Sequence, residues 1–194
     1  AKAALQNWLT ELVDGKFFPV LSANPTAGRI VYAGTNTAEN TIADTDKFTA
    51  KLIGKAKRIA QMDTNSKIQP VKVNGANHFV MIIDPYQARD LKADSEWVSA
   101  QESANIRGET NPIFTGAIGM WDNVIIHENE QCKRTTTGAS SAMVGHALFL
   151  GAQAGVMATA QDAKWVEKDF DYDNQTGFAI SRILGIAKTQ YKSN

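Results

Sequence analysis

Residues 104–128 read ANIRGETNPIFTGAIGMWDNVIIHE, and this stretch determines how the rest of the chain is interpreted. A polar loop, interrupted by glycines and by Pro112, leads into the apolar run Val124–Ile126, which predicts a buried strand. Pro112 fixes its own φ and pushes Asn111 into an extended conformation, so this loop is predicted to hold one shape. Neither a phosphate-binding glycine motif nor a nucleophile elbow occurs in the sequence. The pattern therefore indicates a packing surface rather than an active site.

The same loop supplies the candidate residues for contacts between subunits. Glycines allow tight backbone paths, and apolar side chains beside them can be buried at a neighbouring molecule. The alternative is that these side chains pack within their own monomer, and the sequence leaves both open. The candidate set is Arg107, Asn111, Pro112, Phe114, Gly116, Gly119 and Trp121.

Helices are predicted wherever apolar residues recur at helical spacing. The first covers residues 5–13 and is predicted to end at Asp14-Gly15 and Pro19, and the second covers residues 48–60. Two short helices are predicted over residues 86–91 and 95–104. Small and apolar residues predict a central helix over residues 141–160, in which the spacing of Gly151 and Gly155 would let a neighbouring element approach closely.

Strands are predicted between these helices. Residues 71–73 and 79–83 flank Asn74-Gly75 and predict a hairpin, and the continuous apolar run 79–83 predicts burial on both faces. Residues 124–126 and 178–186 predict further strands, with loops over 22–45 and 135–141 and a turn over 169–176. Helices and strands mix without a βαβ alternation, so the predicted class is α+β.

Composition excludes several classes of function. The chain has 194 residues, 43% of them hydrophobic, which is enough for a substantial core. Its 20 basic and 20 acidic residues give a net charge of zero, which argues against a dedicated nucleic-acid-binding domain. A single cysteine excludes an intrachain disulfide framework and favours a reducing compartment. Neither a signal peptide nor a membrane span is predicted.

Some polar residues could still carry chemistry. His127 and Cys132 are the nearest pair of potential metal ligands or catalytic groups, and the neighbouring Lys133 and Arg134 are expected to lower the thiol pKa. This leaves, as an alternative interpretation, a small cytosolic hydrolase or metal-dependent enzyme. No catalytic residue, metal ligand or cofactor is assigned, because one cysteine and scattered histidines do not make a site.

Two charged segments suggest weaker alternatives. Lys47, Lys51, Lys55, Lys57 and Arg58 form one face of the predicted helix 48–60, and this face could bind phosphate as a nucleic-acid-binding module. A solvated helix face is the simpler explanation and is favoured over phosphate binding. The alternating aspartates of residues 169–173 start like a calcium loop, but the required glycine and glutamate are replaced by Asn174 and Ile180. A turn with solvated carboxylates is therefore predicted.

Several blocks of the sequence, in order, closely resemble the N4-type family of phage major capsid proteins. The most specific blocks cover residues 100–108, 111–119 and 124–128. Others are DPYQARDLK at residues 84–92 with Trp97, LFLGAQA at 148–154, residues 165–174, and GIAKTQY at 185–191.

The resemblance implies the HK97-type coat fold, with a peripheral lobe that contains a long spine helix and an axial lobe around a central sheet. The first helix would be the C-terminal part of that spine helix. An N-terminal arm and an extended β-loop would be missing, so the chain, which starts at Ala1, is expected to be an N-terminally truncated or processed piece in which residues 1–194 form one capsid-type domain fragment of two lobes.

The function implied by the resemblance is structural. The protein would be a coat subunit of a tailed phage or prophage, without catalysis, cofactor or small-molecule substrate. Its partners would be copies of itself, assembled into rings and an icosahedral shell, and packaged double-stranded DNA held by weak non-specific contact. The expected location is the virion capsid, after assembly in the cytoplasm of the bacterial host and without a membrane.

Overall fold

The computed structural model describes residues 2–62, 67–73, 75–103, 118–172 and 174–189. They divide into two compact units. The sheet unit contains Asn24–Ala152, and the hairpin unit combines Ala1–Ala23 with Gln153–Gln190. Both helices and strands are present in the described residues, as the α+β prediction requires.

The sheet unit is built around strand β2 (Ala76–Ile83). On one side β2 pairs in parallel with β4 (Val124–Glu128), which in turn pairs with β3 (Gly119–Trp121). β2 also pairs antiparallel with β1 (Val71–Val73) through a turn at Gly75, where φ is +82°, and with β7 (Leu148–Leu150). The predicted hairpin and the predicted strand at Val124 are therefore confirmed.

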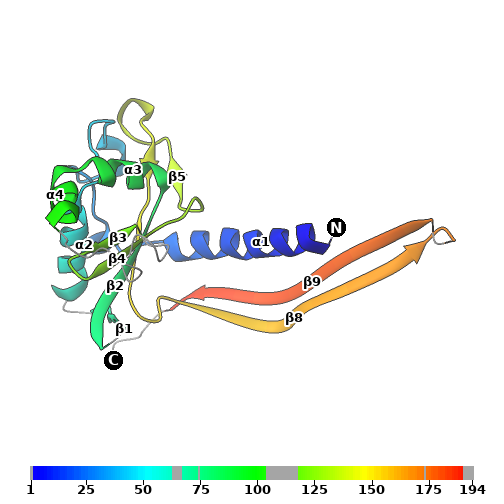
Figure 1. Cartoon of the computed structure of the whole chain (residues 1–194). Coiled ribbons are helices and arrows are strands. Elements are labelled where there is room, and N and C mark those ends of the chain that lie inside the picture. Colours follow the sequence, from blue (N-terminus) through cyan, green and yellow to red (C-terminus); the bar gives the residue numbers. More distant parts are fainter. Residues whose placement is uncertain (1, 63–66, 74, 104–117, 173, 190–194) are drawn as a thin grey trace. The chain divides into compact units, whose positions relative to one another are not determined.

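The core of the sheet unit lies where helices cover this sheet (Figure 1). The helices are α2 (Ala50–Met62), α3 (Pro85–Ala93) and α4 (Ser95–Ser103), close to their predicted positions. From His78 to Ile83 of β2, buried residues alternate with half-buried ones. One face of the strand is therefore buried as predicted, whereas the other is only half-buried. The buried core consists of Phe48, Ala50, Ile53, Phe79, Met81, Ile83, Ala88, Leu91, Trp97, Val124 and Ile126.

Asp84 joins strand β2 to helix α3. Its carboxylate oxygen Oδ1 accepts the backbone N–H of Tyr86 at 2.7 Å, and the Gln87 side chain accepts the N–H of Asp84 at 3.1 Å. This reciprocal capping box, with Pro85 in the first turn, satisfies N–H groups that a helix start leaves unpaired. The dipeptide Asp84-Pro85 thus ends β2 and starts α3.

The remaining segments of the sheet unit are short. The predicted loop 22–45 is largely irregular and contains the 3₁₀ turns η1 (Ala27–Arg29) and η2 (Glu39–Thr41). The predicted loop 135–141 contains η4 (Ala139–Ser141) and follows the first strand of the pair β5 (Arg134–Thr135) and β6 (Val144–Gly145).

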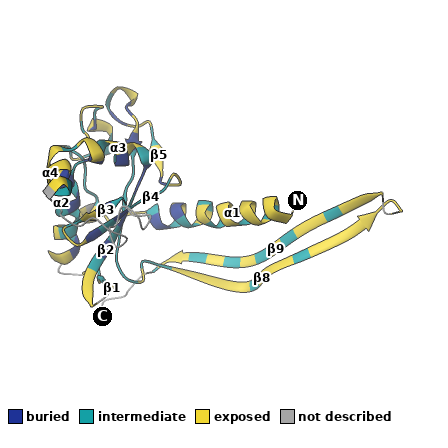
Figure 2. Ribbon diagram, in the orientation of Figure 1, coloured by how far each residue is buried: buried dark blue, intermediate teal, exposed yellow. Residues whose placement is uncertain are grey.

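The hairpin unit consists of helix α1 (Lys2–Ser22) and the long antiparallel strands β8 (Gly155–Phe170) and β9 (Gln175–Lys188). Their pairing runs from Gly155 opposite Lys188 to Phe170 opposite Gln175, with register shifts between Thr159 and Lys164. Both the predicted turn over 169–176 and the strand that follows it are confirmed. Most residues of the two strands are exposed (Figure 2).

Two helix predictions were wrong. The first helix does not end at Asp14-Gly15 but continues through Pro19 to Ser22, anchored by the buried Phe18 and Leu21. Proline removes one backbone hydrogen bond from a helix, and here tertiary packing outweighs that loss.

The second error is the helix predicted over 141–160, a segment that instead forms β6, β7 and the start of β8. A Cβ atom added to Gly151 would lie 2.3 Å from the carbonyl oxygen of Gln69, so this glycine is required by a close backbone approach and not by helix packing. Among the described residues, no helix is long and apolar enough to cross a membrane.

Candidate assembly surface

Only Gly119 and Trp121 of the candidate interface residues lie within the described part of the chain, both in β3. Gly119 is buried against Trp97, because a Cβ added there would lie 2.9 Å from two atoms of the indole. The ring of Trp121, which is half-buried, lies 6.1 Å from that of Trp97. Arg107, Asn111, Pro112, Phe114 and Gly116 fall outside the described residues, so the interface role of the set stays a prediction.

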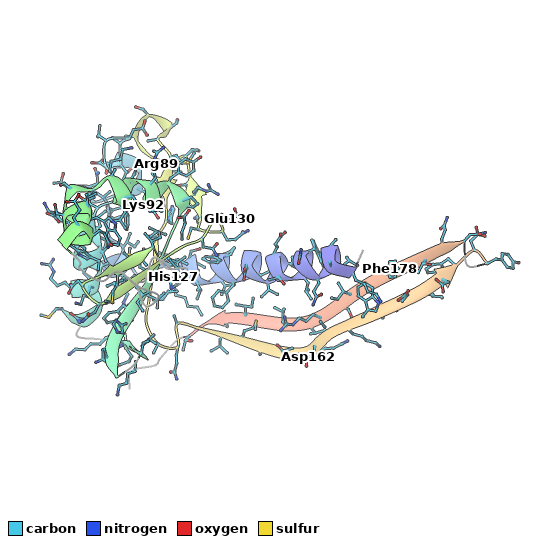
Figure 3. All side chains as sticks on the ribbon, in the orientation of Figure 1. Arg89, Lys92, His127, Glu130, Asp162 and Phe178 are labelled. Atoms are coloured by element: carbon cyan, nitrogen blue, oxygen red, sulfur yellow. The ribbon has the colours of Figure 1, made fainter. Side chains whose placement is uncertain are left out.

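His127 and Cys132 occupy different environments. His127 is half-buried on β4, opposite Ile82 of β2, whereas Cys132 is 3% exposed (Figure 3). Burial raises the pKa of the Cys132 thiol to about 11, and the nearby Asp84 carboxylate acts in the same direction. The expectation that Lys133 and Arg134 lower this pKa was therefore wrong: Arg134 does act that way, but desolvation outweighs it. Such a thiol is a poor nucleophile at neutral pH.

Metal binding gains no geometric support. Within the described ranges, no three His, Cys, Asp or Glu side chains gather closely enough to hold a metal ion. Of the acidic turn, Asp169 is opposite Thr176 in the hairpin and Asp171 has a φ of +53°, while Asp173 falls outside the described residues.

The basic face of α2 is partly used inside the sheet unit. The Lys57 ammonium donates to the Asp122 carboxylate at 2.6 Å and to its backbone carbonyl at 2.8 Å. Lys51 forms an ion pair with Glu96 at 3.0 Å, which raises the Lys51 pKa. These contacts attach α2 to the β3–β4 turn and to α4, so Lys51 and Lys57 have acidic partners within the sheet unit.

The hairpin unit carries the most extended exposed apolar surface. Large apolar side chains that are 43–99% exposed occur along β8, at the turn and on β9: Val156, Met157, Val166, Phe170, Tyr172 and Ile183. Clustered exposed apolar side chains mark protein–protein contact sites. Sequence reasoning missed Val156 and Met157 because it assigned the start of β8 to a helix.

A groove separates α1 from the hairpin within the same unit. Its volume is about 520 Å³, and it is lined by Lys2, Gln6, Leu9, Thr10, Val13, Asp14, Ala163, Trp165, Ile180 and Arg182. The Trp165 ring lies 5.6 Å from that of Phe178, which Figure 3 labels on β9. Lys2 lies 5.3 Å from the Trp165 ring and 3.6 Å from the Glu167 carboxylate. The groove thus combines an apolar wall with two basic side chains, Lys2 and Arg182, and one acidic side chain, Asp14.

Comparison with known proteins identifies the family of the chain. The sequence pattern of a family described as "Phage capsid protein" matches residues 22–194. The chain belongs to this family. This phage capsid protein is 35% identical over 127 residues to the major capsid protein of Pseudomonas phage KPP25, a match that covers 61% of the chain and 34% of that relative. The chain therefore spans about a third of the length of the curated relative.

Solved structures match the capsid protein over almost its whole length. It is similar to the capsid of Ralstonia phage GP4, with 28% identity, a TM-score of 0.79, and coverage of 96% of this chain and 61% of that one. The capsid asymmetric unit of cyanophage Pam1 matches with 22% identity and a TM-score of 0.79, over 98% of this chain and 64% of that one. The capsid of Helicobacter pylori bacteriophage KHP30 matches with 16% identity and a TM-score of 0.68, over 99% and 60%.

These likenesses confirm the HK97-like phage capsid fold as the class of this α+β chain. The family match confirms the expectation of a structural, non-enzymatic protein. His127 and Cys132 therefore need no catalytic explanation. The virion capsid is the location that family membership supports.

Proposed function

We propose that this chain is part of an N4-type major capsid protein that assembles with copies of itself into rings and an icosahedral shell around double-stranded DNA. The observation that carries the proposal is the hairpin unit, whose long two-stranded ribbon exposes large apolar side chains on both strands. A ribbon of this kind is poorly stable in isolation and is suited to being covered by a neighbouring molecule. Family membership supports the same function.

The two units correspond, in this proposal, to the two lobes of the coat fold. The hairpin unit would be the peripheral lobe, with α1 as its spine helix, and the sheet unit would be the axial lobe. The loop that contains Arg107, Asn111, Pro112, Phe114 and Gly116 would add further contacts between subunits. Because the net charge is zero, binding to packaged DNA would be weak, non-specific and reduced by salt.

The proposal is tested by size-exclusion chromatography with light scattering and electron microscopy. The chain is expressed as it stands, and again with the natural coding sequence that flanks it, in a bacterial cytoplasm. We expect discrete rings or shells, and we expect the substitution Ile183→Asp on the exposed ribbon to reduce their yield at least tenfold. Monomers at every protein and salt concentration, in both forms, would contradict the proposal.

A further inference from the structure

Three buried polar side-chain atoms of the hairpin unit have no hydrogen-bond partner among the described residues: the Thr189 hydroxyl and two N–H donors that line the α1–hairpin groove. Trp165 Nε1 and Arg182 Nε are buried and have no hydrogen-bond partner among the described residues. Another nitrogen of Arg182 donates to Thr159 Oγ1 at 3.4 Å, which leaves the Nε–H unused. An unsatisfied buried N–H destabilises the folded state, so native proteins seldom retain one without a reason. Two in one place point to an acceptor that arrives from outside.

Both donors lie on the wall of the α1–hairpin groove. Trp165 is paired with Ile180, and Arg182 is two residues further along β9, so the three side chains share the face that is turned to α1. Leu9 and Val13 of α1 form the apolar wall opposite. The volume of about 520 Å³ is in the range of sites that take a bulky ligand. An occupant that fits has an apolar body and carries an oxygen acceptor, preferably a charged one.

The chain itself presents such a group at the hairpin tip, defined here as Asp169–Tyr172. Tyr172 is 99% exposed and Phe170 is 50% exposed, although both are large aromatic residues. Asp171 and Tyr172 each have a φ of +53°, which is unfavourable for side chains of this kind. The carbonyl of Asp171 accepts the N–H of Asn174 at 3.1 Å and closes the turn. The tip therefore offers aromatic rings between carboxylates, and nothing in its own hairpin unit covers Tyr172.

A hairpin tip cannot enter the groove of its own chain. Five residues of extended strand separate Trp165 from Phe170, which is a span of about 17 Å at 3.3 Å per residue. The pairing of β8 with β9 continues without a break from Lys164 to Phe170 and keeps the ribbon extended. A hairpin tip that occupies this groove must therefore come from another copy of the chain.

We propose that the hairpin tip of one copy docks into the α1–hairpin groove of a second copy. The Tyr172 ring packs between the apolar walls, and oxygen atoms of the tip accept hydrogen bonds from Trp165 Nε1 and Arg182 Nε. The carboxylates of Asp169 and Asp171 complement the charges of Lys2 and Arg182. Since the two surfaces differ, the contact is head-to-tail and can close into a ring. This inference rests on the self-assembly proposed above, and it assigns a specific contact to it.

Site-specific cross-linking tests the contact. One tagged population carries Thr10→Cys in the groove, a second carries Gln175→Cys beside the tip, and the mixture is treated with a short bis-maleimide at neutral pH. The natural Cys132 does not interfere, because it is buried and burial raises its pKa. We expect a mixed dimer, and a decrease of at least fivefold when Tyr172→Ala is added to the tip population or Arg182→Gln to the groove population. Tyr172→Ala leaves the fold intact because this side chain is exposed.

The matched control replaces Thr10→Cys with Ala179→Cys, which is paired with Val166 on the opposite face of the ribbon. Light scattering on the same samples separates the two proposals. If the protein assembles but the groove pair cross-links no better than the control pair, the docking is wrong and the coat function stands. If neither assembly nor cross-linking occurs, both are wrong.

Discussion

The Arg134 guanidinium nitrogen Nε lies 3.8 Å from the Asp84 carboxylate oxygen Oδ2, and that carboxylate is almost fully buried. Asp84 therefore has two roles, because its other oxygen caps α3. The Oδ2 atom accepts no hydrogen bond from the described residues, so the charge of Arg134 is its principal compensation. This residue links the strand β2, the helix α3 and the strand β5.

We expect Asp84→Ala to lower the free energy of unfolding by about 1–2 kcal/mol, the usual cost of removing an N-cap. Asp84→Asn keeps an acceptor for the Tyr86 N–H and loses only the charge, so its loss should be clearly smaller. Urea denaturation of the wild type and both variants measures the difference. If both variants lose the same free energy of unfolding, the hydrogen bond from the Tyr86 N–H contributes nothing beyond the charge of Asp84.

Gly119 provides a test of packing in β3. A methyl group at this position would overlap the Trp97 indole, which is 4% exposed and has little room to move. Gly119→Ala is therefore expected to destabilise the chain by about 1–3 kcal/mol.

The matched control is Gly54→Ala in α2, where an added Cβ meets nothing within 4 Å. Since alanine is the better helix former, this variant should be more stable than the wild type by about 0.5–1 kcal/mol. Thermal unfolding followed by circular dichroism compares the two. The same sign of change for both variants would refute the packing argument.

Glu39 is expected to make the stability of the fold depend on pH. The hydroxyls of Thr135 and Thr137 donate to its Oε1 atom, and His146 Nε2 lies 3.3 Å from the same oxygen. The threonine hydrogen bonds, with a further contribution from His146, lower the Glu39 pKa below 4.5. A carboxylate whose pKa is lower in the folded than in the unfolded state stabilises the fold at pH values above its unfolded pKa. That stability is lost as the pH falls through its folded pKa.

We therefore expect Glu39→Gln to lower the melting temperature at pH 5, above the range in which the Glu39 carboxylate takes up its proton. The difference from the wild type should shrink below about pH 4.5 and vanish in stronger acid. Glu102→Gln, at an exposed position of α4, serves as the control and should change little. A difference that grows on acidification would have the wrong sign.

The Cys132 thiol should react very slowly in the folded chain. Its thiol is 3% exposed, and burial raises its pKa to about 11, so little thiolate exists at neutral pH. We expect labelling by a disulfide reagent at pH 8 to be at least a hundredfold slower in the folded protein than in urea. Comparable rates would show that the segment around Cys132 opens readily.

Sequence patterns predicted best where local preference and burial agree. The apolar run of β2, the Asn74-Gly75 hairpin signal and the stripe of α2 each gave the correct element. Trp97 was placed in the correct helix, and blocks on both sides of it predicted a phage capsid protein, while the N4-type assignment stays a prediction.

Prediction failed where distant contacts decide the conformation. Residues 148–150 contain helix-compatible leucines, yet they pair with Val80–Ile82, about seventy residues away in sequence. Pro19 looked like a stop signal, but Phe18 and Leu21 are buried on either side of it. The groove was also invisible in the sequence, because α1 and the hairpin are separated by the whole sheet unit.

That separation sets an order of events during protein synthesis. Nearly 130 residues lie between α1 and β8, and every strand of the central sheet belongs to this intervening segment. The ribosome releases α1 and the sheet unit before β8 and β9, so α1 has no hairpin to pack against until both strands have been translated. The groove and the exposed ribbon come into existence only with the last strand. A nascent chain that has not reached β9 consequently lacks the groove and the ribbon through which, in our proposal, subunits associate.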